Sequence, residues 1–143
     1  MRVLTFLVGV IVATLTVSSA SALVRIKADT GGQIGPYLEN LMALKNSGER
    51  IAIDGPCLSA CTMVLGVIPR DRICVTSRAR LGFHAAWNPG QDGQPVTSPA
   101  ATKFLMNIYP EHVKIWIKGR GGLSRRMIVL SGPELAAMYP TCR

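Results

Sequence analysis

Apolar residues in this chain come in short runs that glycine, proline and polar clusters separate. Residues 23–28 alternate apolar and basic side chains with a period of two, which predicts a strand that leads into Gly31–Gly32. Over residues 34–44 the apolar positions recur at helical spacing, and the apolar run at 51–53 predicts a second strand. A strand, a helix and a strand in this order predict a right-handed parallel unit.

The stretch 54–68 combines a Gly-Pro turn, a serine and another apolar run. It predicts a sharp turn into a buried helix over 59–67, with Ser59 at the turn. Ser59 then has two roles open to it. It can cap the helix by accepting a hydrogen bond from an unpaired N–H group. It can also be a nucleophile, because the same N–H groups lie where the oxyanion of a tetrahedral intermediate would form. Because parallel strands end at one edge of a sheet, we expect the Gly31–Gly32 turn and Ser59 to share a crevice.

The rest of the chain continues to alternate strands and helices. The strand at 80–84 ends in His84, whereas His112 falls on an apolar helical stripe and reads as a core histidine. The pattern predicts an α/β fold with a small, mainly parallel sheet flanked by helices. The other predicted elements are a strand at 72–75, a polar loop at 88–95, a helix from Pro99 that kinks at Pro110, an extended or helical run at 126–130 and a short helix at 133–138.

The N-terminus has the pattern of a secretory signal. A basic residue is followed by mostly apolar residues 3–17 and then by small residues, with cleavage expected after Ala20 or Ala22. The apolar stretch is shorter than the roughly 20 residues of a membrane span, which favours cleavage. An uncleaved N-terminal anchor is the alternative, because Leu23 and Val24 could extend the apolar run. We therefore predict a signal peptide at 1–22 and a single domain at 23–143, exported to the periplasm or secreted.

Charge and cysteine content agree with export. The chain has 16 Lys and Arg against 8 Asp and Glu, a formal net charge of +8. Such an excess on an exported protein is compatible with an anionic envelope surface as a neighbour, and also with an ordinary solvated surface. The basic residues are spread along the chain and form no nucleic-acid-reading motif, so no nucleic-acid partner is expected.

All four cysteines follow the predicted signal, and an even number in a small exported domain favours disulfides over a metal site. The spacing of Cys57 and Cys61 is not that of a zinc site, and we predict no metal or cofactor. Three pairings are open. We favour Cys57 with Cys61 or Cys74, and Cys142 with whichever cysteine remains.

An ordered set of short sequences carries a resemblance to a known family. It consists of the glycine pair, Gly-Pro-Cys-Leu-Ser-Ala-Cys at 55–61, Arg-Asp-Arg-Ile-Cys at 70–74 and Gly-Phe-His at 82–84. Over residues 24–87 the chain resembles the proteolytic subunit of the Clp protease, within the crotonase-like superfold. It is still more similar to small exported members of that superfold with a Cys-x-Ser-Ala-Cys elbow. The 25 residues from Ser59 to His84 match the nucleophile-to-base spacing of the Clp family.

This resemblance implies roles for four residues. Ser59 matches the nucleophile, His84 the general base, and the N–H groups of Gly31 and Ala60 the oxyanion hole. The aspartate that orients the histidine in the Clp family has no counterpart, since residues 121–130 contain no acid. The resemblance thus implies a Ser59–His84 dyad.

Two function classes follow. The first is an exported serine peptidase or hydrolase that acts on peptide or protein substrates, and the second is a catalytically inactive crotonase-like binding module of the cell envelope. Acyl-thioester chemistry is disfavoured because export separates the protein from coenzyme A. We expect no ATPase partner for an exported protein. We also expect only weak self-association as a homo-oligomer, because the helix that would mediate it is short and kinked.

Overall fold

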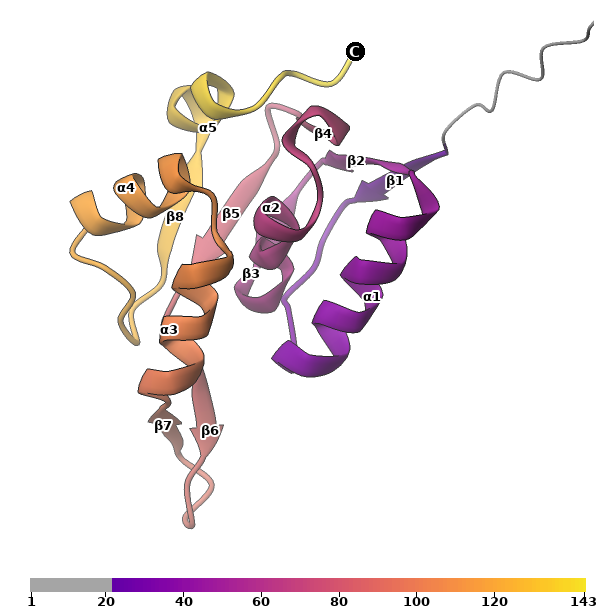
Figure 1. Cartoon of the computed structure of the whole chain (residues 1–143). Coiled ribbons are helices and arrows are strands. Elements are labelled where there is room, and N and C mark those ends of the chain that lie inside the picture. Colours follow the sequence, from indigo (N-terminus) through magenta and orange to yellow (C-terminus); the bar gives the residue numbers. More distant parts are fainter. Residues whose placement is uncertain (1–21) are drawn as a thin grey trace, which may run out of the picture.

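The computed structural model describes residues 22–143, so the predicted signal sequence and its anchor alternative lie outside the described residues. Its first sheet is parallel throughout, in the order β1 (Leu23–Ile26), β2 (Arg50–Ile53) and β4 (Ile73–Val75). Helix α1 (Ile34–Ser47) crosses from β1 to β2 and lies along this sheet (Figure 1). Gly48 ends the helix in the left-handed conformation, with φ of 78°. The predicted strand-helix-strand unit is confirmed.

A second sheet carries the turn of residues 55–61, named the elbow, and has the strand order β3 (Pro56–Leu58), β5 (Arg80–Phe83) and β8 (Ile128–Ser131). β3 and β5 are parallel, and β8 is antiparallel to β5. The α/β class with mainly parallel strands is confirmed, but the strands form two three-stranded sheets where we expected one. The chain changes sheets at Gly55, where a Cβ atom would lie 1.8 Å from the Lys27 carbonyl oxygen. Only glycine permits so close a crossing.

The buried helix predicted after the turn is present in two parts. A 3₁₀ segment, η1 (Ser59–Met63), continues into the α-helical turn α2 (Val64–Val67). Met63 and Val64 are completely buried, together with Phe83 of β5. In Figure 1, α2 lies centrally, with α1 on one side and the later helices on the other. The elbow is therefore anchored in the hydrophobic core.

The C-terminal half covers the second sheet. The polar loop is the tip of a hairpin, β6 and β7, which projects from the body of the domain (Figure 1). The kink expected at Pro110 is a complete break, because Tyr109 is extended before the proline and divides the helix into α3 and α4. The bounds of the remaining elements are η2 (Arg70–Arg72), which precedes β4, and then β6 (Trp87–Pro89), β7 (Pro95–Thr97), α3 (Pro99–Ile108), α4 (Glu111–Gly119) and α5 (Gly132–Met138).

Two disulfides join all four cysteines. Cys57 pairs with Cys61 across the elbow, and Cys74 of β4 pairs with Cys142 near the C-terminus. This is one of the pairings that we favoured. A parallel bridge between Val75 and Thr141 lies beside the second disulfide. Two disulfides fit an oxidising compartment. None of the helices in residues 22–143 is long and apolar enough to cross a membrane.

Candidate active site

Ser59 has an unusual backbone conformation. Its φ is +57°, and within residues 22–143 it is the only residue other than glycine with a positive φ. This conformation costs an L-residue about 1–2 kcal/mol. Ser59 is the first residue of η1, with Leu58 in the N-cap position and no side-chain capping bond, so the capping alternative is not supported. The serine lies in a strained strand-to-helix turn, a backbone setting that exposes the nucleophile in α/β-hydrolases.

His84 lies at the same edge of the second sheet as Ser59. β3 and β5 are parallel neighbours, and Leu58 is paired with Gly82. Ser59 follows β3 directly and His84 follows β5 directly, so both residues leave the carboxyl ends of adjacent strands. Parallel neighbours are about 4.8 Å apart. The topology thus brings together two residues that are 25 positions apart in the sequence.

The imidazole of His84 is held by its own backbone neighbour. Nδ1 lies 2.8 Å from the Ala85 carbonyl oxygen. A carbonyl can only accept, so Nδ1 carries a hydrogen, and in the neutral ring Nε2 is then the nitrogen with the free lone pair. This is the tautomer that a general base needs, and in a catalytic triad an aspartate selects it. Within residues 22–143, no hydrogen bond links this ring to Ser59.

Gly31 packs directly on the elbow. A Cβ atom at Gly31 would lie 2.7 Å from Ser59 Cβ and 2.8 Å from the Ala60 nitrogen. The structure therefore places Gly31 against both Ser59 and Ala60. The N–H group of Gly31, however, donates to Asp29 Oδ1 at 2.8 Å. The Gly31 N–H group, one of the two expected oxyanion donors, is thus already hydrogen-bonded to Asp29 in this conformation.

Asp29 is a residue that the sequence analysis missed. Its other carboxylate oxygen accepts a hydrogen bond from the Tyr37 hydroxyl of α1, and burial together with this contact raises the pKa of Tyr37. Its main chain also pairs with β3, since Asp29 N donates to Pro56 O and Leu58 N donates to Asp29 O, both at 2.8 Å. The sequence does hold a signal for this contact, an aspartate two residues before a glycine. An aspartate side chain often accepts a hydrogen bond from the backbone N–H group two residues later.

The carbonyl group of Ser59 is fixed by a buried pair of hydroxyls. Thr62 Oγ1 donates to Ser59 O at 2.7 Å and lies 2.6 Å from the Tyr109 hydroxyl. Thr62 has one hydroxyl hydrogen, so Tyr109 is the donor in the second bond. Burial raises the pKa of Tyr109 to about 12, which keeps this donor protonated. Together with the buried disulfide between Cys57 and Cys61, these contacts hold the turn on both sides.

A surface pocket of about 320 Å³ opens beside the histidine. Ser59 does not line it, so the pocket adjoins His84 and not Ser59. The walls come from the end of β5, from the hairpin and from the segment before β8. Its lining residues are His84, Ala85, Trp87, Pro95, Arg125 and Met127.

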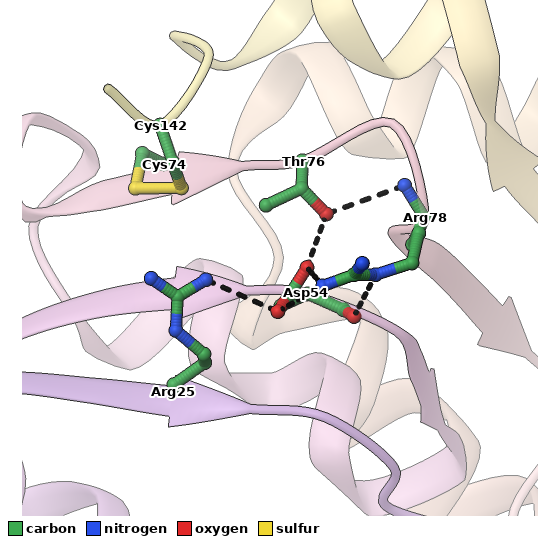
Figure 2. A network of polar contacts seen from close by, with 6 residues as sticks. All are labelled: Arg25, Asp54, Cys74, Thr76, Arg78 and Cys142. Carbon is green, nitrogen blue, oxygen red and sulfur yellow. Dashed lines mark hydrogen bonds and ion pairs between the residues drawn. A yellow bond between two sulfur atoms is a disulfide. The ribbon is translucent and has the colours of Figure 1, made fainter.

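A second polar cluster lies where the chain leaves the first sheet. Asp54 is buried, and its carboxylate accepts from Arg78 at 2.6 Å, from Thr76 at 2.7 Å and from Arg25 at 3.1 Å (Figure 2). The bonds from Arg78 and then Thr76 lower the pKa of Asp54 to about 2. The cluster joins the ends of β2 and β4 to β1, next to the crossing at Gly55. Both carboxylate oxygens are occupied, so Asp54 has a structural role.

The described residues contain no group of three His, Cys, Asp or Glu side chains that could hold a metal ion. No protein-family model matches the chain, and no curated protein matches it. Among solved structures, the chain is similar to the ClpP1 N165D mutant from Listeria monocytogenes, with 12% sequence identity and a TM-score of 0.47. The match covers 81% of this chain and 68% of that chain.

Proposed function

We propose that this protein is an exported serine hydrolase, most simply a peptidase, with Ser59 as the nucleophile and His84 as the general base. The observation that carries the proposal is the positive φ of Ser59 at the end of β3, beside the parallel strand that ends in His84. A strained backbone persists where the surrounding structure imposes it, and such residues cluster at active sites. The two disulfides and the predicted signal sequence support the extracytoplasmic location.

The proposed reaction follows from the two side chains. His84 Nε2 accepts the Ser59 hydroxyl proton as Oγ attacks the substrate carbonyl carbon, and then gives this proton to the leaving amine. Water then attacks the acyl-enzyme. His84 Nε2 takes a proton from this water and returns it to Ser59 Oγ as the acyl group leaves. Hydrogen bonds of this kind are often formed only with substrate bound, so an unliganded site without a Ser59–His84 bond is compatible with catalysis.

The oxyanion would be bound by backbone donors on both sides of the turn. The Ala60 N–H group lies at the start of η1, where a helical segment leaves its N–H groups unpaired. The Gly31 N–H group would contribute after it leaves Asp29. Loss of one such donor costs about 10²–10³ in rate. The Ala85 carbonyl orients the imidazole, as the aspartate does in a catalytic triad, but it adds no negative charge beside the imidazolium that forms during the reaction.

The alternative is a non-catalytic binding module that uses the same edge of the sheet. The engaged Gly31 N–H group and the missing Ser59–His84 hydrogen bond favour it. Contact with an anionic surface and weak self-association remain predictions for either function.

Covalent labelling by a fluorophosphonate distinguishes the two functions. We expect the folded, oxidised protein to be labelled at Ser59, as located by peptide mapping. Ser59→Ala removes the label, and His84→Ala slows labelling by about 100-fold or more, the usual contribution of a general base. Ser77→Ala changes an exposed serine outside the site and serves as the matched control. A folded sample that takes up no label at Ser59 contradicts the hydrolase proposal and favours the binding module.

A further inference from the structure

We propose that the pocket beside His84 selects ligands in which a carboxylate lies next to an apolar group, and that Arg125 is the residue that recognises the carboxylate. This inference rests on the proposed function, because it takes His84 as part of the active site. It assigns to that site a class of substrate: peptides with a negative charge close to the bond that is cut.

The segment that carries Arg125 runs alongside the histidine. Ala85 N, directly after His84, donates to Ser124 O at 2.8 Å, and Phe83 is paired with Ile128 across β5 and β8. These two contacts hold the residues between Ser124 and Ile128 against the end of β5. Arg125 therefore reaches the pocket from a backbone that is fixed to the His84 strand at both ends.

Among the described residues that line the pocket, Arg125 is the only Lys, Arg, Asp or Glu. It is exposed, and it takes part in none of the ion pairs formed within residues 22–143. The nearby arginine Arg120 differs in this respect, since it is paired with Glu134 at 2.6 Å. The planar guanidinium of Arg125 keeps its donors for a ligand, and this fork matches a carboxylate with two parallel hydrogen bonds.

The remaining walls are apolar and accessible. Trp87 is 53% exposed and Met127 is 37% exposed, and both belong to the lining. Large apolar side chains that stay exposed around a charged residue are typical of a surface that a ligand covers. The volume of about 320 Å³ is at the lower end of ligand pockets, enough for one or two amino-acid residues. A ligand that fits has an apolar side chain against Trp87 and an anion at Arg125.

Two parts of a peptide can supply such a carboxylate: the free C-terminus, or an Asp or Glu side chain next to an apolar residue. Three short peptides distinguish these sources. Acetyl-Ala-Ala-Leu with a free carboxylate tests the terminus, its amide is the uncharged control, and acetyl-Ala-Leu-Asp amide tests the side chain.

Binding is measured in the Ser59→Ala background, where no turnover occurs, through the fluorescence of Trp87. The other tryptophan, Trp116, is buried and gives a constant background. We expect at least one carboxylate peptide to bind about 10-fold more tightly than the amide. Arg125→Ala abolishes this difference, whereas Arg126→Ala, an exposed arginine next to it that does not line the pocket, preserves it.

Three results would overturn the inference: equal affinity for acid and amide, no binding of any peptide, or equal losses in the Arg125 and Arg126 variants. Fluorophosphonate labelling of the wild type separates this outcome from failure of the proposed function. Labelling without a carboxylate preference refutes the pocket assignment alone. A carboxylate preference without labelling refutes the hydrolase and leaves a binding module with the specificity described here.

Discussion

Ser59 combines a strained backbone with a side chain that caps no helix. Neither a core-packing nor a capping role explains why an L-residue occupies this conformation, since glycine would adopt it without cost. At the scale of single residues, Ser59 is thus the position where stability and the proposed chemistry are opposed.

Ser59→Gly is expected to raise the free energy of unfolding by about 1 kcal/mol, because glycine removes the penalty of a positive φ. Ser59→Ala removes the hydroxyl but keeps the strain, so its stability stays close to that of the wild type. Both variants lose fluorophosphonate labelling. Urea denaturation measures the difference. Equal stabilities of the two variants would show that the turn is not strained.

Asp54 makes stability depend on acid pH. Its pKa is about 2 in the folded protein and 3.8 in its ordinary state, so the unfolded chain binds the proton more readily. The stabilisation is complete above pH 3.8 and is lost as the pH falls toward 2. We expect urea midpoints at pH 5 and pH 3 to differ less in Asp54→Asn than in the wild type. An unchanged difference would contradict the structural role of the carboxylate.

At the scale of elements, the elbow is held by neighbours from several parts of the chain. Thr62 of η1 donates to the Ser59 carbonyl and accepts from Tyr109, which follows α3. This link connects the conformation of the turn to the packing of α3 on the core. The hydroxyl pair is buried, so each lost hydrogen bond leaves an unsatisfied group.

Thr62→Val removes both bonds at nearly constant shape. We expect it to cost about 1–3 kcal/mol and to slow labelling of Ser59, because the turn loses its fixed carbonyl group. Tyr109→Phe is the matched control, since it removes the hydrogen bond from Tyr109 to Thr62 and leaves the Thr62–Ser59 bond intact. It should lower stability while labelling stays near the wild-type rate. Equal labelling rates in both variants would show that Thr62 does not position Ser59.

The strands and helices that the sequence predicts are those with a clear apolar pattern, either periodic as in β1 and α1 or a short continuous run as in β2 and β4. β3 has no such pattern, because Pro56, Cys57 and Leu58 read as part of the turn, so the second sheet was not predicted. The Asp54 cluster was also missed, because its partners come from separate strands and meet only in the folded chain.

At the scale of the whole molecule, the C-terminal segment is joined covalently to the first sheet. The disulfide between Cys74 and Cys142 spans 68 positions, whereas the elbow disulfide spans 4. Within the described residues, α5 is also joined to α4 through the Arg120–Glu134 ion pair, and His112 of α4 hydrogen-bonds Tyr139 just after α5 at 3.2 Å. The second sheet, the C-terminal helices and the tail therefore form one body with the elbow.

The two disulfides are expected to contribute unequally. The loop-entropy relation gives about 4 kcal/mol for the Cys74–Cys142 bond and about 2 kcal/mol for the Cys57–Cys61 bond. Replacing each pair with alanine and measuring urea denaturation tests this order. The Cys57/Cys61 double variant should also slow labelling of Ser59, whereas the Cys74/Cys142 double variant, while still folded, should not. The reverse pattern would contradict an elbow held by its own disulfide.

The most direct test of the central claim is a crystal structure of the protein after reaction with a fluorophosphonate. We predict phosphorus bonded to Ser59 Oγ, a phosphonyl oxygen about 2.7–3.1 Å from the Ala60 nitrogen, and His84 Nε2 within hydrogen-bond distance of the adduct. An adduct on another residue, or one at Ser59 with the imidazole turned away and the oxygen facing solvent, would contradict the account.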